Sequence, residues 1–314
     1  MIRQFPEFKK LELSDKVEIE DITRQYLPYS DYHFTQMWTW DNHEPSLLSK
    51  LDDNIVIRHS DALTGESFYS FLGSSCPNST INTLFDFLHG KNLPKILRWI
   101  PQEIAEKSDQ GLYSITEDRD NNDYILDVIE LFNASGKKYQ NYRHLLNKFG
   151  RSGSHFRVCA LDLTDKNVHG QVNTLFMEMW KNIKPDKVVG DLSFELKALS
   201  KLLDGAKEFE SLTSIGIFDD EKCVAFMIID VIDEHYAIIP YLITNKSIDG
   251  LFQFVIKKAI EFLYSRNIRY LNYEPDFGIA SWRRYKMSYN PCHFLKKYTI
   301  TAGNQDYPIV VDKN

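Results

Sequence analysis

A short hairpin followed by a strand, a long apolar helix and another strand constrains the fold of this chain most. Ser214–Phe218 and Cys223–Val231 are rich in β-branched and aromatic residues, and the polar turn Asp219–Glu221 separates them, as in an antiparallel hairpin. The next elements predicted are a strand over Tyr236–Ile243, an apolar helix over Ile248–Tyr264 and a strand over Ile268–Tyr273. We expect residues 155–273 to form one sheet with the apolar helix packed on it.

The rest of the chain also alternates strands and helices. Predicted strands are Asn54–His59, Ser67–Gly73, Lys95–Ile100, Tyr124–Leu131 and His155–Leu163, the last with Phe156, Val158 and Ala160 facing inward. The predicted class is α+β, with mixed, largely antiparallel sheets in two domains, 1–135 and 136–314. Trp38 and Trp40 are predicted to be core residues.

Composition excludes several classes of protein. Hydrophobic residues make up 43% and charged residues 26% of the 314, which indicates a globular chain. The longest apolar run, Cys223–Ile229, is too short to span a membrane, and the first residues lack the apolar stretch of a signal peptide. The four cysteines form no Cys-x-x-Cys pair, so we expect free thiols in a reducing cytoplasm.

Charge is distributed unevenly along the chain. The net charge is −7, yet residues 136–151 and 281–297 each carry five Lys or Arg and no Asp or Glu. Positive charge concentrated in two segments of an acidic chain indicates an anionic ligand.

The first basic segment is predicted to be an amphipathic helix. Tyr139, Tyr142, Leu146 and Phe149 recur at spacings of three and four and form its apolar stripe. Its candidate phosphate-binding residues are Lys137, Lys138, Arg143, Lys148 and Arg151. The alternative is an ordinary solvated basic face.

The second basic segment follows the last predicted strand, which is where open α/β sheets place their sites. Glu274 or Asp276 is the candidate general base, and Lys286 or Tyr289 the candidate oxyanion or proton donor. Arg283 and Arg284 are candidate phosphate ligands. The alternative is a structural C-terminal segment whose charges pair with one another.

The order of elements resembles the GNAT fold of acyl-CoA N-acyltransferases. Those enzymes hold the CoA pyrophosphate on a Gly-rich loop at a helix start. At that place this chain has Thr244–Gly250, with one Gly and with Asp249 beside it. The carboxylate would repel pyrophosphate, so CoA is not the expected cofactor.

Metal sites are not expected either. Asp118–Asp123 begins like a calcium loop but lacks the required Gly, and Ile129 stands where a bidentate Glu is needed. The nine histidines show no His-Glu-x-x-His spacing.

Three stretches resemble uncharacterised bacterial proteins related to the C-terminal domain of phosphatidylglycerol lysyltransferases. They are Ser30–Thr35, Gly136–Phe149 and Asn272–Pro291. The resemblance implies two tandem GNAT-like domains, similar also to the Fem peptidyl transferases. It implies transfer of an aminoacyl group from aminoacyl-tRNA to an amine or hydroxyl acceptor, without metal or CoA.

Two alternatives stay open beside aminoacyl transfer. One is a CoA-dependent N-acyltransferase, which the sequence at Thr244–Gly250 disfavours. The other is a non-catalytic binding protein on the same fold, which is favoured by Tyr273, where relatives tend to have Arg, and by Leu242-Ile243, where they tend to have a charged pair.

Overall fold

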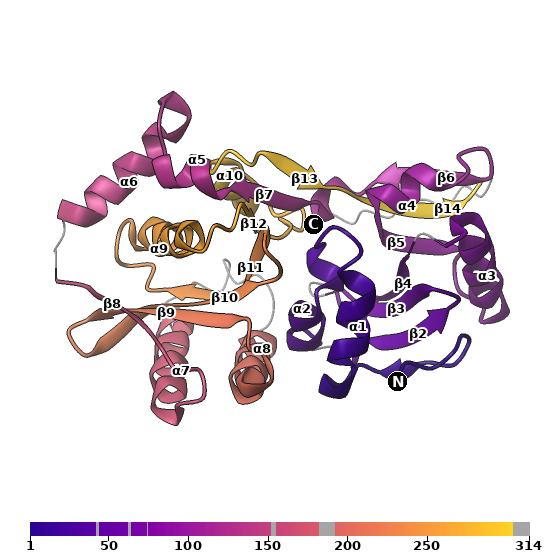
Figure 1. Ribbon diagram of the computed structural model, residues 1–314, viewed down its shortest axis with the longest axis horizontal. Coiled ribbons are helices and arrows are strands. Elements are labelled where there is room, and N and C mark those ends of the chain that lie inside the picture. The colour runs from indigo at the N-terminus through magenta and orange to yellow at the C-terminus, as the bar shows by residue number, and fades with distance from the viewer. Residues whose placement is uncertain (42–43, 62–63, 74, 152–154, 182–191, 304–314) are drawn as a thin grey trace.

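The computed structural model describes residues 1–41, 44–61, 64–73, 75–151, 155–181 and 192–303. Within these ranges the chain forms two seven-stranded sheets that lie side by side along the long axis of the molecule (Figure 1). Helices pack on both sheets, so the predicted α+β class with mixed sheets is confirmed.

The first sheet has the strand order β1-β2-β3-β4-β5-β14-β6. Six of its strands come from the N-terminal part of the chain and one from near the C-terminus. Their bounds are β1 Lys9–Lys10, β2 Leu47–Leu51, β3 Asn54–Ser60, β4 Ser67–Leu72, β5 Ile96–Pro101, β6 Tyr113–Glu117 and β14 Lys297–Ala302.

The second sheet has the order β13-β7-β12-β11-β10-β9-β8. Its strands are β7 Asp123–Asp127, β8 Arg157–Ala160, β9 Leu212–Asp219, β10 Lys222–Val231, β11 Tyr236–Thr244, β12 Tyr270–Asn272 and β13 His293–Leu295. The predicted hairpin is β9–β10, and β8 to β12 share one sheet, as predicted for residues 155–273.

Pairing is largely antiparallel, as predicted. Among the described strands, parallel pairs join β4 to β5 and β11 to β12. The β11–β12 pair covers three residues of each strand and ends at Ile238 and Asn272. β11 continues to Thr244, so the chain that follows Asn272 leaves the sheet beside the unpaired part of β11.

Helices cover both faces of the second sheet (Figure 1). On one face lie α5 (Val128–Asn133), α6 (Gln140–Arg151) and α9 (Leu251–Ser265), and on the other α7 (Lys166–Lys181) and α8 (Leu192–Gly205). Successive side chains of a strand point to opposite faces. On β10, Ala225 and Met227 join the α9 core while Phe226 and Ile228 join the α7–α8 core. The apolar run Cys223–Ile229 is therefore a strand buried on both faces.

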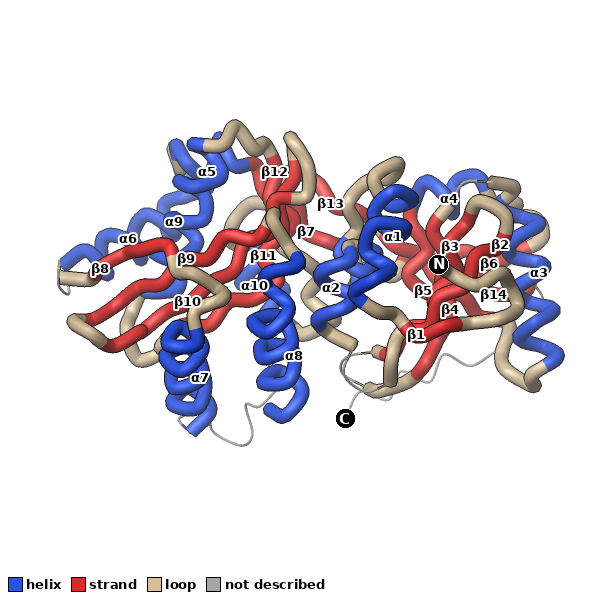
Figure 2. Tube along the Cα trace, turned by 60° about the horizontal axis from the view of Figure 1, so that its bottom comes forward, coloured by secondary structure: helices blue, strands red, loops and turns tan. Residues whose placement is uncertain are grey.

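Four helices belong to the first half: α1 (Lys16–Thr23), α2 (Phe34–Thr39), α3 (Pro77–Gly90) and α4 (Gln102–Lys107). α1 and α2 lie between the two sheets (Figures 1 and 2). Trp38 of α2 is buried, as predicted, and its ring lies 5.5 Å from that of Phe209. Trp40 is half-buried and stacks on Tyr241. α2 thus belongs to both halves of the molecule.

The two sheets exchange strands near the middle and the end of the chain. The chain leaves the first sheet after Glu117 and enters the second at Asp123, and β14 then returns between β5 and β6. A single cut at residue 135 therefore does not separate the sheets.

Two predicted strands differ from the structure. The strand expected over Tyr124–Leu131 ends at Asp127, because the Asp127 carboxylate accepts a hydrogen bond from the Glu130 N–H at 2.9 Å and caps α5. The strand expected over His155–Leu163 is the short edge strand β8. Val158 and Ala160, predicted to face inward, are exposed, and β8 is the last strand in the order of its sheet.

Candidate active site

The chain makes a fixed turn where β12 ends. Glu274 adopts a left-handed backbone conformation, with φ 58°, and its N–H donates to the Asn272 side-chain oxygen at 2.8 Å. The Lys286 ammonium, on α10 (Ala280–Met287), donates to the carbonyl oxygens of Tyr273 and Glu274. A non-glycine residue in this conformation is under strain and is kept there only by its surroundings. We call residues 272–274 with Lys286 the Glu274 turn.

The Glu274 carboxyl is partly buried and accepts a hydrogen bond from the Gln36 side chain of α2. Burial raises its pKa to about 7, although Lys286 acts in the opposite direction. Burial likewise lowers the pKa of Lys286 to about 8, although Glu274 acts to raise it. Near neutral pH this carboxyl is therefore divided between its two protonation states, as a group that takes up and returns a proton must be.

A buried ionic cluster holds α2 beside the Glu274 turn. The N–H and hydroxyl of Ser30 both donate to Asp123 of β7 at 2.7 Å. Lys297 of β14 pairs with Asp123 at 2.8 Å and also with Asp31. Burial raises the pKa of Asp31 to about 6, with Lys297 acting to lower it. The cluster joins the segment before α2 to strands of both sheets, because β7 and β14 belong to different sheets.

Asp276 does not share the exposure of Glu274. It is fully buried, and Arg283 donates to both of its oxygens at 2.9 Å. Burial alone would raise the pKa of Asp276, but hydrogen bonds from Arg283, Tyr124 and the Gly278 N–H hold it below its ordinary value. The role of candidate base therefore passes to Glu274. Arg283 also pairs with Asp120, so it is not free for a phosphate.

Tyr289 lies in a cluster of tyrosines. It is buried, its hydroxyl bonds that of Tyr285, and its ring packs edge-on against Tyr142 and Tyr273. Burial raises its pKa well above the ordinary value, which makes it a poor proton donor. We assign Tyr289 to the packing beneath the Glu274 turn.

The basic residues fall into two groups. Four of the seven candidate phosphate-binding residues already have partners within the protein. Lys138 pairs with Glu130 and Lys148 with Asp249, Arg143 donates to the carbonyls of Ala134 and Gly136, and Arg283 pairs with Asp276 and Asp120. The side chains of Lys137, Arg151 and Arg284 are exposed and have no polar partner among the residues that the structure describes. Asn290 donates to the Lys138 carbonyl at 3.0 Å, so the two basic segments meet.

The start of α9 is covered by α6. Gly250 has φ +77°, and a Cβ there would lie 2.5 Å from the Leu145 carbonyl oxygen and 2.9 Å from Phe149. Lys148 of α6 pairs with Asp249 at 2.6 Å. Side chains and backbone of α6 therefore pack against the start of α9, beside the Thr244–Gly250 segment.

The parallel strands of the first sheet are bridged by a tyrosine. β4 and β5 pair at Tyr69 and Leu97. The buried Tyr32 hydroxyl lies 3.0 Å from the Phe71 carbonyl oxygen and 3.2 Å from that of Trp99. Tyr32 fills the gap where the two strands diverge.

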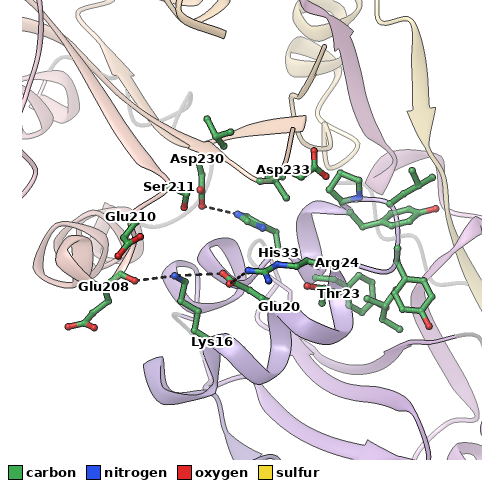
Figure 3. A pocket seen from close by; sticks show the side chains of 18 residues that line it. Lys16, Glu20, Thr23, Arg24, His33, Glu208, Glu210, Ser211, Asp230 and Asp233 are labelled. Carbon is green, nitrogen blue, oxygen red and sulfur yellow. Dashed lines mark hydrogen bonds and ion pairs between the residues drawn. The ribbon is translucent and has the colours of Figure 1, made fainter. Parts of the chain in front are cut away.

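A cavity of about 610 Å³ lies between the halves of the molecule (Figure 3). We call it the interdomain pocket. One wall is α1 with residues 26–29, 32 and 33, and the other is formed by residues 208, 210, 211 and 230–233 around β9 and β10. His33, the residue before α2, reaches Asp230 of β10 across it.

Sequence reasoning did not identify Gln36, Asp31, Asp123, Lys297 or Asp230. Four of them are buried and the side chain of Asp31 is 9% exposed, and their partners lie far away in the sequence. The motif that contains Asp31 was recognised, but nothing local indicates which charge it meets.

Two features of the described part of the chain concern metal ions and membranes. No group of three or more His, Cys, Asp or Glu is arranged to hold a metal ion there. No helix there combines the length and apolarity needed to cross a bilayer. The four cysteines are all free thiols.

Comparison with known proteins gives a family and a fold. The sequence model of the family described as "Phosphatidylglycerol lysyltransferase, C-terminal" matches residues 23–301. No curated protein sequence matches.

Three solved structures resemble the fold. A conserved protein of unknown function from Bacteroides thetaiotaomicron has a TM-score of 0.79 at 20% identity, covering 96% of this chain and 100% of that one. The C-terminal domain of a putative lysylphosphatidylglycerol synthetase from Agrobacterium fabrum has a TM-score of 0.62 at 11% identity, covering 92% of each chain. L-PGS from Bacillus licheniformis has a TM-score of 0.61 at 16% identity, covering 98% of this chain and 96% of that one.

Proposed function

The chain belongs to the family of phosphatidylglycerol lysyltransferase C-terminal domains, and from this premise we propose that it transfers an aminoacyl group from aminoacyl-tRNA to an amine or hydroxyl acceptor. One observation carries the proposal to particular residues. Glu274 has a pKa raised to about 7 by burial, is partly exposed, and lies on a strained turn held by Lys286. Strained residues with perturbed pKa values concentrate at functional sites.

The reaction needs a group that accepts and then returns a proton. The acceptor N–H or O–H gives its proton to Glu274, and its nitrogen or oxygen forms a bond to the ester carbonyl carbon. The bond from that carbon to the tRNA 3′ oxygen then breaks, and the oxygen takes the proton from Glu274. Lys286 uses two of its three donors on backbone carbonyls and directs the third at the developing oxyanion.

The donor is aminoacyl-tRNA and not acetyl-CoA. Two features support this choice: α6 covers the start of α9, and Asp249 lies at the same place. Lys137, Arg151 and Arg284 are exposed and without a polar partner among the described residues, so they are available to contact a long polyanion.

We propose two tandem GNAT-like domains, 1–135 and 136–314, which exchange the strands β7 and β14. The presence of two separate seven-stranded sheets supports this division. The protein works in the cytoplasm, where charged tRNA is available. Free thiols are consistent with that compartment.

The substitution Glu274→Gln tests the catalytic assignment. We expect tRNA binding near that of the wild type and a transfer rate reduced about 10²–10⁴-fold, the usual contribution of a general base. Glu221→Gln, in the exposed β9–β10 turn, is the matched control and should leave the rate unchanged. A wild-type rate in Glu274→Gln would remove Glu274 from the mechanism.

Filter binding with charged tRNA, beside calorimetric titration with acetyl-CoA, tests the donor. Micromolar acetyl-CoA affinity without tRNA binding would replace the proposal by a CoA-dependent acyltransferase. If neither binds, the chain is a binding protein for another ligand.

Charge reversal tests the tRNA surface. Reversing Lys137, Arg151 and Arg284 together should flatten the salt dependence of tRNA binding by about 0.7–0.9 in slope for each lost phosphate contact. The control reverses Lys10, Lys91 and Lys107, three exposed residues of the first half, and changes the net charge equally. Equal slopes in the two triple variants would assign the effect to net charge alone.

A further inference from the structure

The helix α2 belongs to the first half of the chain, but its side chains are held by a strand of the second sheet. The Thr35 hydroxyl donates to the Asp230 carboxyl of β10 at 2.6 Å. The ring of His33, the residue before the helix, bonds the same carboxyl at 2.9 Å (Figure 3). All six residues of α2 are buried. A short helix held in this way keeps a fixed position relative to β10.

The segment that leads into α2 is fixed to the Glu274 turn as well. The side-chain amide of Asn272 donates to the Pro28 carbonyl at 2.8 Å and to Asp123 at 3.0 Å. Asp123 also accepts both hydrogen bonds of Ser30. The oxygen of the same Asn272 side chain accepts the Glu274 N–H at 2.8 Å. One buried side chain therefore joins the approach to α2 with the turn that carries the candidate base.

Gln36 of α2 is the residue that meets the Glu274 carboxyl. Its side chain is buried, and its Nε2 donates to Glu274 Oε1. Its own Oε1 has no hydrogen-bond partner among the residues that the structure describes. A buried amide with an unpaired oxygen lowers stability, and an apolar side chain of similar length would avoid that loss. Packing alone therefore does not explain an amide here, whereas a donor directed at the carboxyl does.

The charges around Glu274 act on it without bonding its carboxyl. Lys286 of α10 and Lys297 of β14 lower its pKa, while Asp123 of β7 and Asp31 raise it. The Lys286 ammonium donates to backbone carbonyls of the turn instead. Within the described part of the chain, the hydrogen bond to the carboxyl comes from the neutral Gln36 amide.

A donor at this place has two effects on a general base. It fixes the rotation of the carboxyl group, and a base must be held in a productive geometry to accept a proton. It also favours the ionised form, because a hydrogen bond to the charged state stabilises that state. Since Gln36 bonds Oε1, the second oxygen, Oε2, is left for the proton of the acceptor.

We propose that Gln36 is a positioning residue for the transfer reaction, which orients the Glu274 carboxyl and favours its ionised form. The inference rests on the proposed function and deepens it. It makes the first half of the chain a part of the catalytic unit, because α2 supplies the residue that sets the base in the second half.

The substitution Gln36→Met tests the proposal by kinetics, since Met keeps the length of the side chain and removes the donor. We expect the acid limb of the pH–rate profile to move up by about 1 pH unit, and kcat at pH 7 to fall at least about fivefold, with the KM for charged tRNA unchanged. Thr39→Val is the matched control. Thr39 is buried on the same helix, and its hydroxyl bonds none of the described residues, so kcat and the profile should stay as in the wild type.

Carbon-13 NMR of protein labelled at the glutamate carboxyl carbon gives a measurement that does not depend on activity. The Glu274 signal is identified by its loss in Glu274→Gln, and its titration midpoint should rise by about 1 pH unit in Gln36→Met but not in Thr39→Val. If this shift occurs but the wild type transfers no aminoacyl group, the proposed function fails and the action of Gln36 on the carboxyl stands. If transfer depends on Glu274 but Gln36→Met keeps the wild-type midpoint and kcat, the inference about Gln36 is wrong and the function stands.

A further measurement needs no substitution at the buried position 36. In nitrogen-15-labelled wild-type protein, the side-chain amide signal of Gln36 should shift with pH at the same midpoint as the Glu274 carboxyl. It should not shift over this range in Glu274→Gln. A Gln36 amide signal that ignores the ionisation of Glu274 in the wild type would overturn the proposal.

Discussion

Replacing Glu274 by Gln should stabilise the protein in alkaline solution. In the folded state burial raises the pKa of Glu274 to about 7, against an ordinary value of 4.5. The folded protein therefore holds a proton that the unfolded chain has lost between these two values, and the free energy of unfolding falls as the pH rises through this window. Gln does not titrate, and its side-chain oxygen can still accept the hydrogen bond from Gln36.

The size of the effect follows from the two pKa values. The difference corresponds to about 3 kcal/mol when Glu274 is fully ionised, at about 1.4 kcal/mol per pH unit. Part of this gain is lost in the variant, because Lys286 no longer has the carboxylate that raises its own pKa. We expect Glu274→Gln to raise the free energy of unfolding by about 1–2 kcal/mol at pH 8 and to change it little at pH 5.

Urea denaturation of both proteins at pH 5 and pH 8 measures this difference. The control is Glu130→Gln, which removes an exposed carboxylate paired with Lys138. Its free energy of unfolding at pH 8 should fall by about 0–1 kcal/mol, whereas that of Glu274→Gln should rise. If Glu274→Gln were destabilised at pH 8, or equally stabilised at both pH values, the pKa of the Glu274 carboxyl would not be raised by burial in the folded protein.

Three further substitutions test the packing around the site by urea denaturation or hydrogen exchange. Gly250→Ala should lower the free energy of unfolding by about 2 kcal/mol or more. Gly136 has the same φ of +77° but nothing within 4 Å of an added Cβ, so Gly136→Ala should lose only the backbone cost of about 1–2 kcal/mol. Equal losses would mean that α6 does not contact a Cβ at position 250. Lys297→Met should cost about 3–5 kcal/mol, because it leaves two buried carboxylates without their cation, and a loss below about 1 kcal/mol would contradict the buried cluster. Arg283→Lys keeps the charge but loses the two-point contact with Asp276, so the Gly278 amide, which donates to Asp276, should exchange faster than in the wild type.

The second sheet could be predicted well because its signals are local. The apolar run of β10, the turn after Asp219 and the apolar face of α9 each lie within about twenty residues, and each indicates one element. Tyr124–Leu131 was mistaken for one strand because its apolar composition fits a strand and a helix equally. Asp127, a good helix-capping residue, was the signal for the change.

The catalytic roles given to the candidate residues stay predictions. The structure places Lys286 against the carbonyl oxygen of Glu274, and both residues belong to the segment after β12. Arg283 and Asp276 pair with each other instead, which is what the structural alternative for that segment predicted.

The number of Lys and Arg residues in a segment does not show which of them are exposed and which form ion pairs within the protein. Lys297 was counted in the second basic segment, yet it is buried against Asp123, which lies 174 residues earlier. Partners of this kind are set by the exchange of strands between the sheets, and no local pattern records them.

The position of β14 has a consequence for how the chain folds during synthesis. β5 and β6 of the first sheet are joined through β14, and about 180 residues separate Glu117 from Lys297. At a translation rate of about 5–20 residues per second, β14 is synthesised roughly 10–40 s after β6, and the first sheet is incomplete until then. During that interval the edges of β5 and β6 are open to pairing with other chains. A chaperone that shields strand edges on the ribosome should therefore raise the yield of native protein more than one added after release.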